Sequence, residues 1–200
     1  MRKLITLLLL MVSFGALYSQ VGKDIEMIRT EGDYVIVLEK DNIRFEFWDE
    51  YVSYDANMNR LGAMKWHSNI RQVIGEKEHI LTLYRYANDA GTARVTVFDK
   101  NFNVLEKKAY KKGTVEGIKA TDNFFMVQRR EKYWGPIFYE IYDWEFNQLG
   151  RLQTDRFVKE VYLMNNHIVI KRSVRNSLNC EIKSYDAQFN ELGSRRCRHN

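Results

Sequence analysis

The sequence predicts an all-β protein built from four tandem copies of one four-stranded antiparallel unit. Three observations support this fold class. A turn motif recurs four times, short apolar runs recur with the same period, and no segment has sustained helical spacing of its apolar residues. Because each copy carries the same signals in the same order, we expect the copies to share one local structure.

The turn motif is a nine-residue segment with four constant columns. It reads YDANMNRLG from Tyr54, FDKNFNVLE from Phe98, YDWEFNQLG from Tyr142 and YDAQFNELG from Tyr185. Each copy has an aromatic residue, an aspartate, a bulky apolar residue and an asparagine, and the aspartates are Asp55, Asp99, Asp143 and Asp186. Successive aspartates are 44, 44 and 43 residues apart. This agreement indicates a true internal repeat.

The apolar runs mark the second strand of each unit. They begin at Tyr34, His79, Phe124 and His167, and each follows a polar turn. Short β-branched runs between turn residues are typical of strands buried on both faces. Each unit is therefore expected to hold four strands, and in the last unit these are predicted at about 157–164, 167–172, 179–185 and 193–198.

The recurring turn is predicted to join the third strand of each unit to the fourth. Its aspartate can accept a backbone N–H bond from the residue two positions on, in an Asx-turn. The asparagine is expected to adopt the left-handed conformation that closes the hairpin. The bulky apolar residue between them is expected to fold under the turn and cover the core. The four aspartates are therefore assigned a structural role.

The first turn also matches the start of a calcium-binding loop, from Asp55 to Asn59. Such a loop needs a glycine and a glutamate further on, and this chain has Arg60 and Trp66 at those places. The four histidines are far apart in the sequence and form no local ligand pair. We therefore predict neither a metal site nor a cofactor.

Four-stranded units with a period of about 40 to 45 residues resemble the blades of β-propellers. The aromatic–aspartate pair at the end of the third strand is similar to the Trp-Asp dipeptide of WD40 repeats, whereas the Gly-His dipeptide of that family is absent. The resemblance is architectural, covers residues 20–200 and implies a four-bladed β-propeller. An open stack of sheets, a half-ring that dimerises and an irregular β-barrel are the alternatives.

The N-terminal segment has the layout of a secretory signal peptide. Arg2 and Lys3 precede an apolar run over 4–17, and small or polar residues follow. A membrane span needs about 20 apolar residues, so this run is short for one. We expect residues 1–19 to be a cleaved signal peptide and 20–200 to form one secreted or periplasmic domain; an uncleaved anchor is the alternative. The absence of Asn-x-Ser/Thr sites favours a bacterial source.

The two cysteines, Cys180 and Cys197, lie near the C-terminus. If the last turn centres near Gln188 and Phe189, antiparallel pairing places the two cysteines opposite each other. A pair of cysteines in a secreted domain usually forms a disulfide. We therefore predict a bond across the final hairpin, with two free buried thiols as the alternative.

The charge of the chain argues against nucleic acid as a partner. Without Arg2 and Lys3, 29 of the 31 basic residues remain against 26 acidic residues, so the mature chain carries a mild net charge of +3. This charge is too small and too scattered for a nucleic-acid surface. No stable membrane insertion is expected after signal cleavage.

Candidate binding residues lie where the second strand of each unit leads into the third. Arginines open three of these loops and aromatic residues follow them: Arg85, Tyr86, Arg129, Arg130, Tyr133, Trp134 and Arg172. Positive charge beside exposed rings suits an anionic glycan or an acidic protein surface. The alternative is that the arginines are solvated strand ends and that the aromatic rings pack locally.

No catalytic motif is assembled in the sequence. Gly-x-Ser-x-Gly, His-Glu-x-x-His and a phosphate-binding glycine-rich loop are all absent. Carboxylates do occur in or near the same loops, at Asp49, Glu50, Asp89 and Glu131. The leading hypothesis is a non-catalytic module that binds a protein or a glycan. A small carbohydrate-active enzyme that uses loop carboxylates, and a structural component of an envelope assembly, are the alternatives.

Overall fold

The computed structural model describes residues 24–29, 33–40, 48–67, 69–86, 92–132, 134–154, 157–174 and 179–198. The predicted signal peptide, residues 1–19, lies outside this part of the chain. The described residues form sixteen β-strands. They include no helix long and apolar enough to cross a membrane.

The strands form four antiparallel sheets, and each sheet consists of four strands consecutive in sequence. The first sheet contains β1 (Asp24–Arg29), β2 (Tyr34–Lys40), β3 (Trp48–Asp55) and β4 (Arg60–His67). The second contains β5 (Ile70–Glu76), β6 (His79–Arg85), β7 (Ala93–Asp99) and β8 (Val104–Tyr110). The third contains β9 (Thr114–Ala120), β10 (Phe125–Arg130), β11 (Ile137–Tyr142) and β12 (Gln148–Thr154). The fourth contains β13 (Val158–Met164), β14 (His167–Ser173), β15 (Asn179–Tyr185) and β16 (Glu191–Arg198).

These sheets confirm the predicted all-β repeat, and we call them blades. In the last blade the observed strands agree with the predicted ranges to within one residue, except that β16 begins two residues earlier than expected, at Glu191. Because each strand pairs with its neighbours in sequence, each blade is a simple meander whose hydrogen bonds are local.

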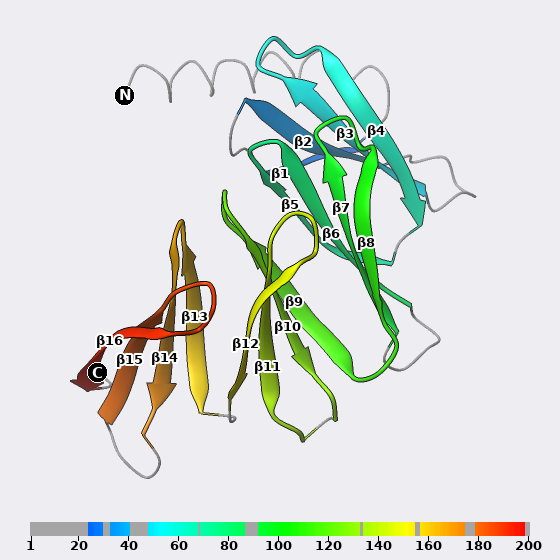
Figure 1. The fold of residues 1–200 in the computed structure, drawn as a ribbon. Coiled ribbons are helices and arrows are strands. Elements are labelled where there is room, and N and C mark those ends of the chain that lie inside the picture. The colour runs from blue at the N-terminus through cyan, green and yellow to red at the C-terminus, as the bar shows by residue number, and fades with distance from the viewer. Residues whose placement is uncertain are drawn as a thin grey trace.

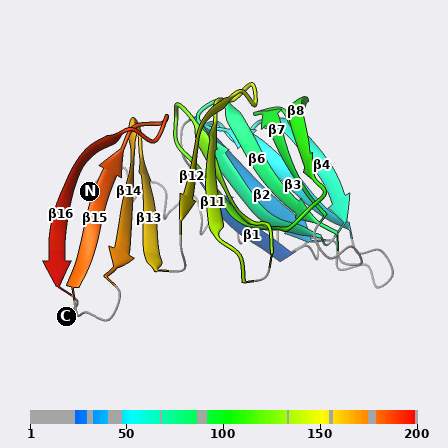
Figure 2. The ribbon, with the colours of Figure 1, turned by 60° about the horizontal axis from the view of Figure 1, so that its bottom comes forward.

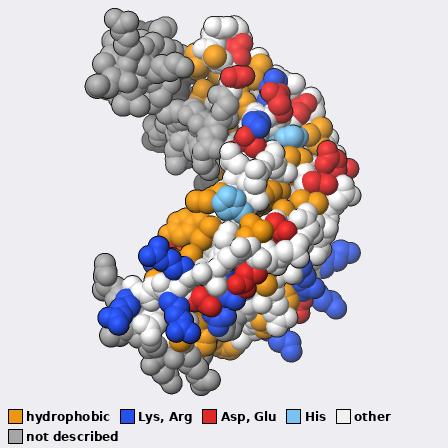
Figure 3. Space-filling model, turned by 60° about the vertical axis from the view of Figure 1, so that its left-hand side comes forward, with side chains coloured by type: hydrophobic (Ala, Val, Ile, Leu, Met, Phe, Trp, Pro, Cys, Tyr) orange, Lys and Arg blue, Asp and Glu red, His pale blue; other side chains and the backbone are white. Residues whose placement is uncertain are grey.

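The blades pack face to face along an arc. Three clusters of buried apolar side chains fill the spaces between the first and second, second and third, and third and fourth blades. Figures 1 and 2 show the first and fourth blades at the two ends of this arc. Among the described residues no core cluster joins these two blades, and Figure 3 shows a hollow on that side of the molecule. In the part of the chain that the structure describes, the arc is therefore open between its ends.

The turns that carry the repeat motif are built by one set of hydrogen bonds. In the second blade, Asp99 Oδ1 accepts the backbone N–H of Asn101 at 2.8 Å and that of Asn103 at 2.9 Å. Asp99 Oδ2 accepts the side-chain amide of Asn103 at 2.8 Å. The other three turns repeat these bonds. The predicted Asx-turn is therefore confirmed. The asparagine side chain lowers the pKa of Asp55 and of Asp186, because it stabilises the charged carboxylate.

The prediction that the asparagine adopts the left-handed conformation is wrong. The positive φ belongs to the residue before it, with values between 61° and 64° at Met58, Phe102, Phe146 and Phe189. The asparagine is already held by its bond to the aspartate. The left-handed backbone instead turns the bulky side chain under the turn, where Phe102 lies 5.9 Å from Phe98 between ring centroids and is 8% exposed. Burial of this ring offsets the roughly 1–2 kcal/mol that a left-handed non-glycine residue costs.

A one-residue bulge follows each of these turns. The pairing between the third and fourth strands shifts register, and the extra residue is a leucine in every blade: Leu61, Leu105, Leu149 and Leu192. Leu61 and Leu149 pack against the clusters that join their blades to the next. Leu192, in the last blade, is 61% exposed. In the first and third blades the bulge therefore aims an apolar side chain at the following blade, whereas Leu105 in the second blade is 46% exposed.

The predicted disulfide is present. Cys180 and Cys197 are directly paired across β15 and β16 and are bonded, with their Cα atoms 4.8 Å apart. Cys180 is fully buried, whereas most of β16 is exposed. The bond therefore fastens the outermost strand of the last blade close to the end of the chain.

Removing this disulfide is expected to destabilise the protein. A Cys180→Ala, Cys197→Ala double variant should lose about 3 kcal/mol of unfolding free energy, because the bond closes a loop of 17 residues in the unfolded chain. Urea unfolding followed by circular dichroism measures the loss. The unmodified protein in the presence of a reductant is the control and should fall to the same stability. An unchanged midpoint in both samples would contradict the prediction.

Candidate functional site

The predicted binding residues lie on one rim of the arc. In each blade the second and third strands are joined on this rim, which also carries the connections from one blade to the next. The motif turns lie on the opposite rim (Figure 1). The rim residues are Arg85 at the end of β6, Tyr86 just after it, Arg129 and Arg130 at the end of β10, Trp134 in the next loop, and Arg172 in β14. Tyr133 lies outside the described residues.

The arginines of this rim make contacts within the protein. Arg85 donates to the backbone carbonyl of Val115 in the third blade. Arg130 Nε lies 2.7 Å from Glu116 Oε1, and Arg130 Nη1 donates to the carbonyl of Gly135 at 3.3 Å. These contacts fix the loop and the neighbouring blade, so they draw the arginines away from solvent.

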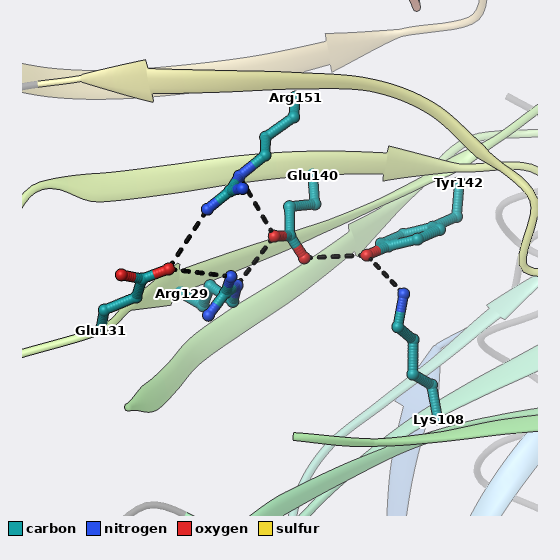
Figure 4. A network of polar contacts seen from close by, with 6 residues as sticks. All are labelled: Lys108, Arg129, Glu131, Glu140, Tyr142 and Arg151. Atoms are coloured by element: carbon teal, nitrogen blue, oxygen red, sulfur yellow. Dashed lines mark hydrogen bonds and ion pairs between the residues drawn. The ribbon is translucent and has the colours of Figure 1, made fainter. Parts of the chain in front are cut away.

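Arg129 belongs to a larger network between the second and third blades (Figure 4). Its Nε lies 2.8 Å from Glu140 Oε1, and Arg151 approaches the same oxygen at 3.5 Å. Both arginines also lie 3.3 Å from Glu131. Burial alone would lower the pKa of Arg129, but Glu140 outweighs it and the pKa is raised. The guanidinium of Arg129 therefore stays charged beside Glu140.

The other side of the network reaches β8 of the second blade. Tyr142 donates to Glu140 Oε2 at 2.8 Å, and Lys108 Nζ donates to the Tyr142 hydroxyl at 2.9 Å. Burial raises the pKa of Tyr142, so its hydroxyl stays protonated. Burial lowers the pKa of Lys108. Glu140 is only 4% exposed, and each of its carboxylate oxygens has a polar partner. The network therefore links the second and third blades through ion pairs and hydrogen bonds. Glu140 was not among the predicted site residues, because its charged partners, Arg129 and Arg151, come from other strands.

The exposed part of the rim is apolar and basic. Tyr86, Trp134 and Val174 follow the second strands of three blades and are 38%, 89% and 42% exposed. Lys111 and Lys112, between the second and third blades, are exposed, as is Lys132 beside Trp134. Tyr86 packs edge-on against Tyr84, so it is anchored. Among the side chains of this rim that the structure describes, Trp134 is the largest apolar one exposed to solvent.

A close backbone approach brings the lysines next to the Trp134 loop. Gly113 has a φ of 78°, and a Cβ there would lie 2.2 Å from the carbonyl oxygen of Arg130. The connection that carries Lys111 and Lys112 therefore lies against the start of the Trp134 loop, in a conformation that favours glycine. We call Lys111, Lys112, Lys132 and Trp134 the Trp134 surface.

The loop carboxylates do not assemble into a pair in the part of the chain that can be described. Glu50 lies 2.8 Å from Arg60, and Glu131 is bound to Arg129 and Arg151. Asp89 and the side chain of Asp49 lie outside the described part. Two cavities of about 290 and 330 Å³ lie between neighbouring blades, and only Glu160 contributes a carboxylate to either lining. The described residues contain no group of three histidine, cysteine, aspartate or glutamate side chains placed to hold a metal ion.

No family model matches the chain, and no curated protein matches it in sequence. Solved structures do share its fold. The β-propeller domain of the Trilobed protease from Pyrococcus furiosus is 11% identical, with a TM-score of 0.61 over 89% of this chain and 57% of that domain. The acylaminoacyl peptidase of Pyrococcus horikoshii is 12% identical, with a TM-score of 0.58 over 89% of this chain and 32% of that chain. HIRA(644-1017) is 9% identical, with a TM-score of 0.53 over 84% of this chain and 52% of that chain.

These similarities concern the fold alone. The chain spans little more than half of the propeller domain that it matches and about a third of the peptidase. At 9–12% identity these structures indicate the arrangement of blades and no activity, so the site has to indicate the function. The comparisons confirm the predicted architecture: the chain is an all-β protein whose four antiparallel sheets are β-propeller blades.

Proposed function

We propose that this protein is a non-catalytic binding module that recognises a protein or a glycan through the Trp134 surface. The observation that carries the proposal is the exposure of Trp134, which presents 89% of its surface to solvent beside three exposed lysines. Leaving a tryptophan in water forgoes a large part of its burial energy, and tryptophan is enriched among the residues that dominate binding interfaces. The lysines favour an anionic partner.

The contacts of the rim arginines give this surface a rigid support. Arg130 holds both Glu116 of β9 and the backbone of the Trp134 loop at Gly135. The backbone N–H of Gly135 donates to the carbonyl of Lys132 at 2.8 Å, which closes the loop as a turn. A partner that binds Trp134 would therefore meet an ordered loop, and less conformational entropy would be lost on binding. In this proposal Arg129 and Arg130 position the surface, and Trp134 and the lysines contact the partner.

The disulfide supports a secreted or periplasmic location, because such bonds persist in oxidising compartments. The predicted cleavage after residue 19 would release the domain into that compartment. Cell fractionation followed by N-terminal sequencing of the isolated protein tests both. Recovery of a chain that still begins at Met1 would contradict cleavage.

Replacing Trp134 is expected to abolish partner capture. In a pull-down from the native cell envelope, Trp134→Ala should reduce the captured partner by about 30-fold, the effect of losing roughly 2 kcal/mol at a binding hot spot. A Lys111→Glu, Lys112→Glu, Lys132→Glu triple variant should lose an anionic partner and keep a neutral one. Leu105→Ala, at another exposed apolar residue, is the matched control and should capture as the unmodified protein does. Identical partner sets for all of these variants would contradict the proposal.

A further inference from the structure

Two cavities lie at the same place in the repeat, one between the first and second blades and one between the third and fourth. Their volumes are about 290 and 330 Å³, and we call them the first-junction and third-junction cavities. Each is lined by a facing pair from the second and third strands of one blade, which is Leu38 with Tyr51 or Gln128 with Tyr139. Each lining also contains residues from the first strand of the next blade, 70–74 in β5 or 158–162 in β13. Because the connections between blades lead into these strands, both cavities lie toward the rim that carries the Trp134 surface.

A one-residue bulge places a cation in the lining of each cavity. The register shifts at Arg71 in β5 and at Lys159 in β13, and these are the extra residues of the two bulges. A bulge interrupts the alternation of a strand and re-aims a side chain. Arg71 and Lys159 are exposed, and neither forms an ion pair with another residue that the structure describes. Each cavity therefore has an unpaired cation at the same repeat position, close to a tyrosine at the same repeat position.

The junction between the second and third blades differs at the same place. The corresponding residues there are Leu83, Val95 and Val115, which are at most 1% exposed and belong to the core cluster between these blades. The extra residue of the bulge in β9 is Glu116, and its carboxylate is bound by Arg130. This fold can therefore fill the space with apolar side chains. The combination of a cavity, a tyrosine and an unpaired cation at the other two junctions indicates that they bind a ligand.

The third-junction cavity has an excess of positive charge. Glu160 is the one carboxylate among its described lining residues, and Lys171 binds that carboxylate at 3.1 Å. Tyr162 donates to the same carboxylate, so its ring, which is 51% exposed, is held at the wall of the cavity. Lys119 donates to a backbone carbonyl of β13, and its charge has no counter-ion among the described residues. Lys119 and Lys159 are therefore available to an anion beside an anchored aromatic ring.

We propose that the third-junction cavity binds one uronic acid unit of an anionic glycan, and that the first-junction cavity binds a second unit of the same glycan chain. The volume of about 330 Å³ lies at the lower end of the range for small-molecule sites, which suits a single pyranose ring. The carboxylate of the sugar would meet Lys159, and the apolar face of the ring would pack on Tyr162. These cavities are separate from the Trp134 surface, so the inference goes beyond the proposed function.

The repetition of the two cavities favours a glycan over a protein as the ligand. Tyr51 and Tyr139 occupy one repeat position, and Arg71 and Lys159 occupy another, so both cavities suit the same chemical group. A polymer of acidic sugars offers that group again and again along one chain. The surface of a folded protein presents no such regular series. Both cavities also lie toward one rim, where a single extended chain can reach them.

Isothermal titration calorimetry with defined tetrasaccharides tests the ligand. The acidic probes are tetramers of galacturonate, of mannuronate and of hyaluronan, and maltotetraose is the neutral control. At least one acidic tetramer should bind, and maltotetraose should not. Lys159→Gln should weaken the binding about tenfold, because a hydrogen bond to a charged group is lost. Lys107→Gln, at an exposed lysine of β8, is the matched control and should bind as the unmodified protein does. Failure of all three acidic tetramers, or an equal affinity for maltotetraose, overturns the proposal.

The Trp134→Ala variant separates this inference from the proposed function. It should bind the acidic tetramer with an affinity within about twofold of the unmodified protein, because Trp134 does not line either cavity. If Trp134→Ala abolishes binding of the tetramer and Lys159→Gln leaves it unchanged, the glycan binds at the Trp134 surface and the cavity proposal is refuted. Circular dichroism checks that each variant is folded.

Nuclear magnetic resonance locates the bound sugar. Titration with the acidic tetramer should shift the backbone amide signals of residues 70–74 and 158–162, and should leave those of Val95 and Val115 unchanged. Inorganic sulfate at the same concentration should not reproduce these shifts. The proposal is refuted if either range is silent, or if sulfate gives the same shifts, since the cavities would then bind any anion and not a sugar.

Discussion

Replacing Gly62 with alanine is expected to lower the free energy of unfolding by about 3 kcal/mol, at the upper end of what overpacking costs. The added Cβ would lie 2.0 Å from the carbonyl oxygen of Asn101 and 2.7 Å from its Cα. Because these are backbone atoms of a turn held by three bonds to Asp99, no side chain can rotate to relieve the clash. The first and second blades would have to move apart, which loosens the cluster between them.

The repeat supplies matched controls for this prediction. Gly150→Ala meets a similar approach at 2.6 Å and should also be destabilising, whereas Gly193→Ala meets nothing and should be neutral or slightly stabilising. Urea unfolding of the three variants measures the differences. Equal effects at all three positions would show that the glycines act through intrinsic strand preference and not through the neighbouring turn.

Replacing Glu140 with leucine is expected to cost about 3 kcal/mol, because it leaves a buried charge without its main partner. Glu140 is 4% exposed and Arg129 retains 16% of its side-chain surface, so solvent cannot replace the lost bonds. Of its two ion pairs described here, Arg129 would keep the longer one, with Glu131, and the Tyr142 hydroxyl would lose its acceptor. We expect the second and third blades to separate at lower urea concentration.

Two further variants isolate the cause. Glu140→Leu combined with Arg129→Met removes both charges and should recover part of the loss, since an apolar pair of similar size often replaces a buried ion pair at little cost. Glu50→Leu breaks a pair whose arginine, Arg60, is 55% exposed, and should cost less than about 1 kcal/mol. If the double variant is less stable than Glu140→Leu alone, the penalty does not come from the buried charge of Arg129.

The repeat unit could be predicted from sequence because its signals are local. The period, the order of strands and the disulfide partner of Cys180 all follow from the spacing of the motif. The residue that takes the left-handed conformation was misassigned, because asparagine favours it intrinsically while Phe102 gains more from burial. The bulge after each turn was not predicted, although its leucine is present in every copy. A bulge shifts the strand register by one residue, and the alternation of apolar and polar residues does not show where that shift occurs.

The site was less predictable because its contacts are between strands far apart in sequence. The sequence shows Arg129 and Arg130 side by side, yet one binds Glu140 from β11 and the other Glu116 from β9. Neither pairing follows from residue spacing within one strand. The exposure of Trp134 likewise depends on how its loop closes. The openness of the arc depends on the angle between successive blades, and small differences in inter-blade packing set that angle.

The disulfide across the final hairpin has a mechanical consequence. Tension applied to the C-terminal end would otherwise peel β16 from β15 one hydrogen bond at a time, which is the weakest direction in which to load a hairpin. Because Cys197 is covalently joined to Cys180 only one residue before β16 ends, the pulling force passes at once into β15, inside the sheet. A protein tethered through this end would therefore bear load on a covalent bond and on several strands together.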